Sequence, residues 1–331
     1  MPEAPRLRID YRSLLLGGLS ALLYASVVLS PAFLVPVQAA GARRGHGAMV
    51  AAALAAAAAV SGLQLALLYR AGAMTPAMVL MGLSVPLALL AALTLMSLPA
   101  FASVPFVYRA LAAGAAAALA TLPALAVAAA DPSVAAAFEE AAAMAAQAMG
   151  VEVVDTGPLW TIVRSTLASA YGSAMFGLLL ASSFTGSRLV RPAAVGYEPS
   201  GASPSGSPLV MPAPAPRLPA YRVPGPLVWA LLASWAGILL FRVVSGPVLG
   251  AVAWNVAISL SICYGIQGFA VAGHLIGKTG LAPAARMLGP ITLALLLVGG
   301  VAGLMAVGVL ALLGTLETWI PFRATTEGVS P

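Results

Sequence analysis

The chain has 331 residues, of which 61% are hydrophobic and only 8% are charged, and its mean hydropathy is +1.00. A soluble domain carries about 25% charged residues, so this composition excludes a soluble globular protein. Long continuous apolar runs exclude a membrane β-barrel, whose strands alternate in polarity over about 10 residues. The 16 basic residues outnumber the 10 acidic ones, but they are scattered at helix ends and in loops, which indicates membrane orientation rather than nucleic-acid binding.

The first apolar run extends from Ser13 to Ala42, follows three arginines and contains Pro31 and Pro36. It can be interpreted as a signal peptide, one kinked span or a hairpin of two short helices. The hairpin places more of the basic residues on one side, so the positive-inside rule favours it, with a cytoplasmic N-terminus. Because about 14 residues per leg reach only about 21 Å, short of the roughly 30 Å bilayer core, we expect one leg to be re-entrant or packed inside the bundle.

Seven further apolar segments predict membrane helices. They lie at 47–69, 74–97, 104–130, 158–183, 225–244, 247–276 and 288–315. The fold class that follows is an all-α polytopic transmembrane helical bundle with about eight or nine membrane helices, placed in the bacterial cytoplasmic (inner) membrane.

Two segments between these helices differ from the rest in composition. Residues 131–157 carry only acidic charges and predict an external helix that begins at Asp131; a solvated connector and a lid over an external pocket are both open interpretations. Residues 185–224 are rich in Pro, Ser and Gly and predict a cytoplasmic linker that packs no core. This linker divides the chain into N-terminal membrane helices, 1–184, and C-terminal membrane helices, 225–331.

The segment Val248–Ile276 contains no charged residue but many polar ones. At about 100° per residue, several of them fall within a sector of roughly 140°, so they form a polar stripe. Such a stripe avoids lipid, and it either lines a ligand pocket or holds helices together. The candidate ligand-binding residues are Asn255, Ser259, Tyr264, Gln267 and His274, with Arg164 and Arg242 near the mouth of an outward-opening pocket.

No catalytic motif is present, and we expect neither an enzyme nor a cofactor. The single cysteine and two separated histidines also argue against a metal site. Since there is no nucleotide-binding motif, active transport would need a partner such as an ATPase. The candidate docking residues for that partner are Arg43, Arg44, Lys278 and Arg286.

The tail Leu313–Arg323 follows the last predicted span, and the span count places it on the outer side. In this interpretation Trp319 lies at the membrane interface and Arg323 lies among the headgroups.

Three motifs in the C-terminal third have a recognisable pattern. They comprise Trp254, Asn255, Tyr264, Gln267, Gly268, Ala270 and Val271; Lys278 and Arg286; and Leu313, Gly314, Leu316, Glu317, Trp319, Phe322 and Arg323. With these motifs the chain resembles the YybS-like family of uncharacterised bacterial multi-pass membrane proteins. That family is distantly similar to the substrate-binding subunits of energy-coupling-factor transporters, which also begin with a short Pro-containing helix and a basic turn. The resemblance implies no established activity.

Two functions follow as hypotheses. The first is a membrane protein that binds a small solute, and helps to transport it, in the manner of those substrate-binding subunits. The second is a non-catalytic membrane scaffold in an envelope or division assembly, in which the polar stripe only holds helices together.

Overall fold

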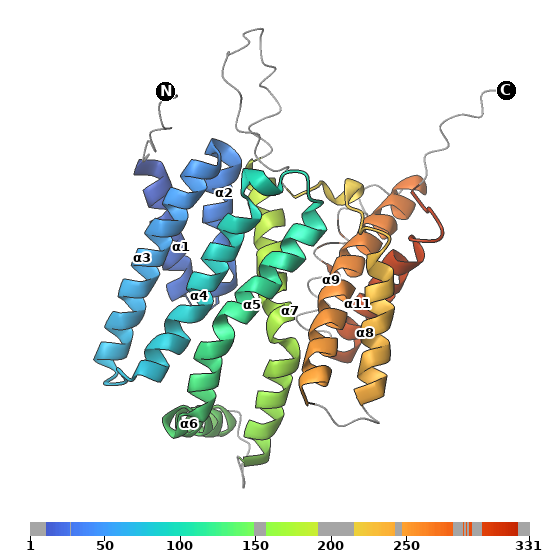
Figure 1. The fold of residues 1–331 in the computed structure, drawn as a ribbon. Coiled ribbons are helices and arrows are strands. Elements are labelled where there is room, and N and C mark those ends of the chain that lie inside the picture. Colours follow the sequence, from blue (N-terminus) through green and yellow to red (C-terminus); the bar gives the residue numbers. More distant parts are fainter. Residues whose placement is uncertain are drawn as a thin grey trace, which may run out of the picture. The chain divides into compact units, whose positions relative to one another are not determined.

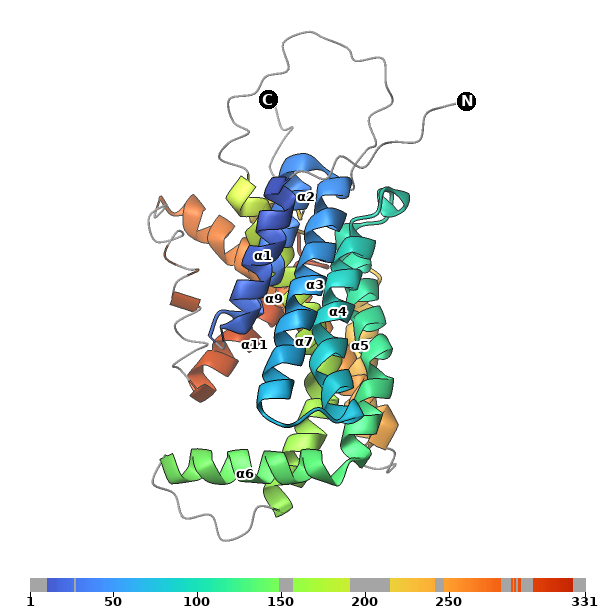
Figure 2. The same ribbon diagram turned by 90° about the vertical axis from the view of Figure 1, so that its left-hand side faces the viewer.

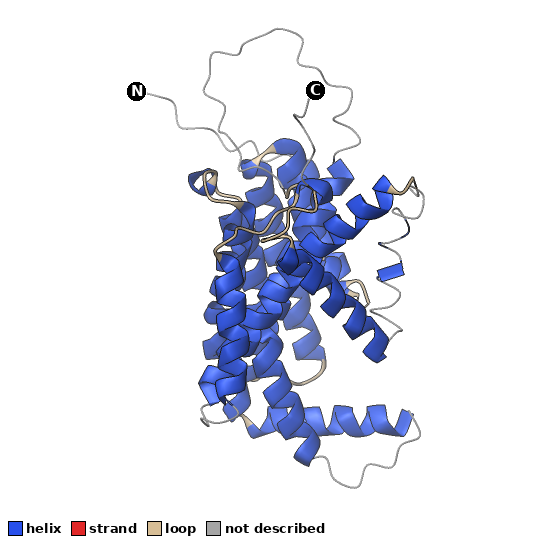
Figure 3. Cartoon of the chain, turned by 90° about the vertical axis from the view of Figure 1, so that its right-hand side faces the viewer, coloured by secondary structure: helices blue, strands red, loops and turns tan. Residues whose placement is uncertain are grey.

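The computed structural model describes residues 11–26, 28–148, 157–190, 215–241, 247–280, 287, 289, 291–292 and 300–323. Within these ranges the chain forms helices and loops and no strand (Figure 3). It divides into two compact units, unit 1 (1–215) and unit 2 (216–331). Five of the described helices are long and apolar enough to cross a membrane, and two shorter ones are also apolar. The predicted all-α polytopic bundle is confirmed.

Unit 1 is a bundle of long antiparallel helices around a short N-terminal hairpin (Figure 1). Its elements are α1 (Tyr11–Ala25), η1 (Ser30–Ala32), α2 (Leu34–Arg44), α3 (His46–Arg70), α4 (Pro76–Met96), η2 (Pro99–Phe101), α5 (Phe106–Ala130), α6 (Pro132–Ala148) and α7 (Gly157–Val190). The predicted spans over these residues agree with the helices, except that α7 continues to Val190, into the first part of the predicted linker.

The predicted short hairpin is present as α1 and α2. At 1.5 Å per residue their 15 and 11 residues reach about 22 and 16 Å, so neither crosses a core of roughly 30 Å. Helix α2 packs against both α3 and α7, and Leu34, Val37 and Ala40 are fully buried. The inner leg of the hairpin therefore lies inside the bundle, where a helix that stops short is tolerated.

The two ends of unit 1 differ in charge. Arg12, Arg43, Arg44 and Arg188 belong to the ends of α1, α2 and α7 that meet at the top of Figure 1. Arg43 Nη2 donates to the carbonyl of Leu189 at 3.4 Å, which joins the end of α2 to the end of α7. We call this the arginine end of unit 1, because the opposite end carries the acidic helix α6.

Helix α6 lies across the end of the bundle, at a steep angle to α5 and α7 (Figures 1 and 2). Its start was predicted at Asp131, and Asp131 Oδ1 accepts hydrogen bonds from the hydroxyl and the backbone N–H of Ser133, at 2.7 and 2.9 Å. These bonds hold the pKa of the Asp131 carboxyl below its usual value. The predicted acidic helix is therefore present, while the acidic residues Glu152 and Asp155 lie outside the described residues.

Unit 2 consists of η4 (Leu218–Ala220), α8 (Leu227–Phe241), α9 (Pro247–Lys278) and α11 (Gly300–Leu316). Helix α9 packs between α8 and α11. On the α8 side, Trp235 and Trp254 meet edge to face with centroids 6.1 Å apart. On the α11 side the two helix backbones are in contact. A Cβ atom added to Gly268 would lie 1.8 Å from the carbonyl oxygen of Leu310, and one added to Gly314 would lie 1.9 Å from the carbonyl oxygen of Tyr264. Only glycine fits at this crossing.

The glycines of α1 provide a matched test of helix packing in unit 1. A Cβ atom on Gly17 would lie 2.6 Å from the carbonyl oxygen of Ala52 on α3, whereas one on the adjacent Gly18 would meet nothing within 4 Å. We expect Gly17→Ala to lower the free energy of unfolding by about 1–3 kcal/mol through overpacking. Gly18→Ala should leave it unchanged or raise it slightly, since Ala favours helix.

The measurement is the thermal midpoint of each purified variant in the same detergent, followed by tryptophan fluorescence. Equal midpoints for the two alanine variants would show that α1 and α3 do not pack as closely as the structure has them.

Candidate functional site

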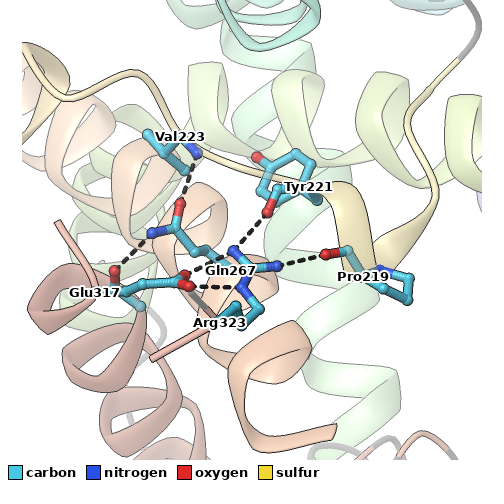
Figure 4. A network of polar contacts seen from close by, with 7 residues as sticks. Pro219, Tyr221, Val223, Gln267, Glu317 and Arg323 are labelled. Atoms are coloured by element: carbon cyan, nitrogen blue, oxygen red, sulfur yellow. Dashed lines mark hydrogen bonds and ion pairs between the residues drawn. The ribbon is translucent and has the colours of Figure 1, made fainter. Parts of the chain in front are cut away.

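A polar network in unit 2 is built around Gln267 of the polar stripe (Figure 4). Gln267 Nε2 donates to the carbonyl of Gly314 on α11 at 3.0 Å. Its Oε1 accepts the backbone N–H of Val223 at 2.6 Å. Gln267 is only 3% exposed. One buried amide thus joins α9 both to α11 and to the segment that precedes α8.

The second part of the network is the ion pair between Arg323 and Glu317. Arg323 Nε and Nη2 contact the two carboxylate oxygens of Glu317 at 2.5 and 2.6 Å, and both side chains are 5% exposed. The same guanidinium donates to the carbonyl of Pro219 at 2.8 Å and to that of Tyr221 at 2.9 Å. A planar guanidinium suits this task because its N–H groups form a fixed fork.

The segment held by this network begins with η4 and continues as extended backbone from Tyr221, and its bonded residues are Pro219, Tyr221 and Val223. Tyr221 and Val223 are buried, whereas Arg222 between them is exposed. Burial against Cys263 and Tyr264 raises the pKa of the Tyr221 phenol far above its ordinary value, so this phenol stays neutral. Residues 216–224 therefore pack onto unit 2.

This packing corrects two predictions. The predicted linker 185–224 was expected to pack no core, but its last residues are a fixed part of unit 2. The tail was predicted on the opposite side from the linker, with Arg323 among headgroups. The Arg323 side chain is instead buried and bonded to that same segment. The end of the linker and the tail therefore lie at the same end of unit 2.

The other predicted ligand-binding residues lie in different surroundings. Ser259 and Tyr264 are buried within unit 2, at 8% and 0% exposure. Asn255 is half-buried and donates from Nδ2 to the carbonyl of Ala251 at 2.8 Å. His274 is half-buried, and its Nε2 is a buried atom with no hydrogen-bond partner among the described residues. The central amide of the stripe, that of Gln267, is bonded to backbone groups of the protein, and a ligand-binding role for the stripe stays a prediction.

The predicted arginine and lysine sites are distributed over both units. Arg164 is exposed near the start of α7 in unit 1, whereas Arg242 and Arg286 lie outside the described residues. The candidate docking residues Arg43, Arg44 and Lys278 are exposed. Among the described residues no group of three His, Cys, Asp or Glu side chains is placed to hold a metal.

A second region, which the sequence did not indicate, is the part of unit 1 between the hairpin and α6. Over residues 61–70 of α3, 78–85 of α4 and 164–172 of α7, no described side chain is buried. A helix packed in a bundle buries one face on every turn. Two or more turns on each of these three helices therefore carry only half-buried or exposed side chains. We call this region the open half of unit 1.

The remainder of unit 1 is closely packed. Around α2, Leu89 and Leu93 of α4 and Phe176 and Leu179 of α7 are at most 2% exposed. The difference follows from the length of the hairpin, because α2 fills the interior at the arginine end only. The open half is thus the part of the bundle that has no central helix.

The open half contains two polar pairs. Gln64 Nε2 on α3 donates to the hydroxyl of Tyr24 on α1 at 2.8 Å, and both residues are half-buried. The Tyr171 hydroxyl on α7 donates to Thr121 Oγ1 on α5, also at 2.8 Å. Sequence patterns did not single out these residues.

Comparison with known proteins supports the membrane assignment. Residues 210–314 match a protein family described as "Predicted membrane protein (DUF2232)". Neither the curated proteins nor the solved structures yield a match to this chain. The matched region covers most of unit 2, including Gln267 and Gly314. The chain is a multi-pass membrane protein similar to an uncharacterised family, and the finer likeness to YybS-like and energy-coupling-factor proteins stays a prediction.

The Arg323–Glu317 pair is tested by removing one partner. Arg323→Ala leaves the Glu317 carboxylate buried without its counter-charge, so we expect a loss of about 3–5 kcal/mol in the free energy of unfolding. The double variant Arg323→Met with Glu317→Gln should recover a large part of that loss, since no buried charge is left.

The measurement is the thermal midpoint of each full-length variant, with size-exclusion chromatography to detect aggregation. A midpoint for Arg323→Ala equal to that of the unaltered protein would mean that the carboxylate is solvated rather than buried.

Proposed function

We propose that this protein binds a small solute in the open half of unit 1 and helps to transport it through the bacterial inner membrane. The observation that carries the proposal is the absence of buried side chains over several turns of α3, α4 and α7. Apolar helices that served only as structure would gain by packing these turns more closely, because dispersion contacts are lost wherever neighbouring atoms are missing.

The polar pairs support a binding role for this region. Polar side chains within membrane helices are costly unless they find partners or serve a ligand. Gln64 offers an amide carbonyl in addition to the N–H that it gives to Tyr24, and Tyr171 offers acceptor lone pairs on its hydroxyl. These groups remain available to a molecule that enters the open half.

The arrangement of charges supports an orientation and a partner. With a cytoplasmic N-terminus, the arginine end of unit 1 faces the cytoplasm, in agreement with the positive-inside rule. Arg43 and Arg44 are exposed there, and a partner ATPase that drives transport would dock on this end. The solute would then enter from the opposite side, where the open half lies. The protein itself would supply binding and no catalysis.

The second candidate function is the non-catalytic scaffold in an envelope or division assembly. The polar network of unit 2 favours it, because Gln267 and Arg323 are bonded to the protein's own backbone. In this case the polar stripe of α9 is a packing device, and the exposed residues at the arginine end would contact a structural partner.

The two candidates differ in what the purified protein retains. For a solute-binding protein, native mass spectrometry of the full chain should detect a bound small molecule. We expect Gln64→Leu to weaken its retention about tenfold, the equivalent of one hydrogen bond of about 1.4 kcal/mol. Leu54→Ala is the control, because Leu54 lies on the same helix outside the open half and is 67% exposed.

A bound protein without any small molecule would favour the scaffold instead. Retention that is the same in Gln64→Leu as in the control would place the solute elsewhere and refute the proposed site.

A further inference from the structure

The segment 216–224 of unit 2, which we call the clamped segment, carries two exposed arginines, Arg217 and Arg222. Both neighbours of Arg222, Tyr221 and Val223, are buried, and each is hydrogen-bonded through its backbone to another part of unit 2 (Figure 4). Because successive side chains on extended backbone point in alternate directions, Arg222 is directed to the surface. Its guanidinium is therefore presented on a backbone that is held in place.

The exposed charge of unit 2 is basic wherever the structure describes it. Glu317 is the one acidic residue described in this unit, and its carboxylate is paired with Arg323 in a buried contact. Lys278, at the end of α9, is exposed as well. The described part of unit 2 therefore offers no other carboxylate to Arg217 and Arg222, and an anionic partner complements this surface.

Two exposed tryptophans belong to the same end of unit 2. Trp229 lies in the first turn of α8, directly after the clamped segment, and is 68% exposed. Trp319 lies in the turn after α11, shortly before the arginine that binds the clamped segment, and is 54% exposed. Exposed tryptophans of membrane helices are typical of the membrane–water interface, where the ring contacts acyl chains and the N–H lies among headgroups. The clamped segment is thus at headgroup level.

We infer that the clamped segment binds an anionic phospholipid. Arg217 and Arg222 bind the phosphate of the headgroup, for which the planar guanidinium is well suited. The rings of Trp229 and Trp319 lie against the glycerol and the first part of the acyl chains. The partner is a lipid and not a free phosphate, because a water-soluble anion would leave the apolar surface of both rings uncovered. This role is separate from the solute site proposed in unit 1.

The test is native mass spectrometry of the full chain titrated with phosphatidylglycerol and with phosphatidylcholine of the same acyl chains. We expect phosphatidylglycerol to bind at least tenfold more tightly. Arg217→Gln and Arg222→Gln should each weaken its binding about fivefold, because each removes one positive charge near the membrane surface. Neither variant should alter the binding of phosphatidylcholine, and added salt should reduce the preference, since exposed charges are screened.

Two further variants make the test specific. Arg70→Gln is the matched control, because Arg70 is exposed at the end of α3 in unit 1 and its loss lowers the net charge equally. It should leave the binding of phosphatidylglycerol unchanged. Arg222→Lys keeps the charge but not the fork of N–H groups, so it should weaken binding less than Arg222→Gln does. The thermal midpoint of each variant shows whether it is folded.

Several results would overturn the inference. One is equal binding of the two lipids, and another is a preference for phosphatidylglycerol that both glutamine variants retain or that Arg70→Gln reduces to the same extent. Competition by glycerol phosphate at the same concentration as the lipid would identify a free anion as the ligand. A protein partner that the glutamine variants release, without any lipid preference, would mean that these arginines bind protein instead.

Discussion

The structure of unit 1 depends on the difference in length between the N-terminal hairpin helices and the bilayer core. The N-terminal hairpin is made of helices of 15 and 11 residues, which are too short to cross a bilayer core of roughly 30 Å. Because α2 nevertheless packs inside the bundle, it fills the interior only at the arginine end. In the other half, several turns of α3, α4 and α7 carry only half-buried or exposed side chains. The location of the proposed solute site follows from where the hairpin stops.

Unit 2 differs from unit 1 in how its polar side chains are satisfied. Its buried polar side chains are directed at its own backbone: Gln267 joins three segments, and Arg323 binds Glu317 together with two carbonyls of the segment before α8. Backbone contact at Gly268 and Gly314 brings α9 and α11 close enough for these bonds. Several residues that carry the sequence resemblance are thus residues that assemble this unit, and this accounts for their pattern without a ligand.

The two functional candidates correspond to these two ways of packing. A network that satisfies all of its members makes a rigid unit, which is what a scaffold needs. A region with half-buried polar groups, such as Gln64 and Tyr171, is what the proposed binding function needs. One chain can contain both, with unit 2 as the rigid part and unit 1 as the part that binds.

The sequence by itself determined the membrane class and the positions of most helices, because a continuous apolar run of sufficient length has few alternatives in a bilayer. It also predicted the short hairpin from the distribution of arginines, and the start of α6 from Asp131. Tertiary structure alone decided what the polar side chains do. The partners of Gln267 lie 44 and 47 residues away in the chain, and the choice between a pocket and a packing contact depends on which helix comes to lie opposite.

Dependence on contacts between distant parts of the chain also explains why the predicted side of the tail was wrong and why the open half was not predicted. Span counting assigns a side to Arg323 from the number of crossings, whereas its actual position is given by bonds to Pro219 and Tyr221, 104 and 102 residues away. The periodicity of α3 cannot reveal which of its turns lack a neighbour, since that depends on where α2 ends in space. An apolar run is equally compatible with a helix face that contacts lipid and with one that contacts protein. Only the three-dimensional packing of the helices distinguishes these two environments.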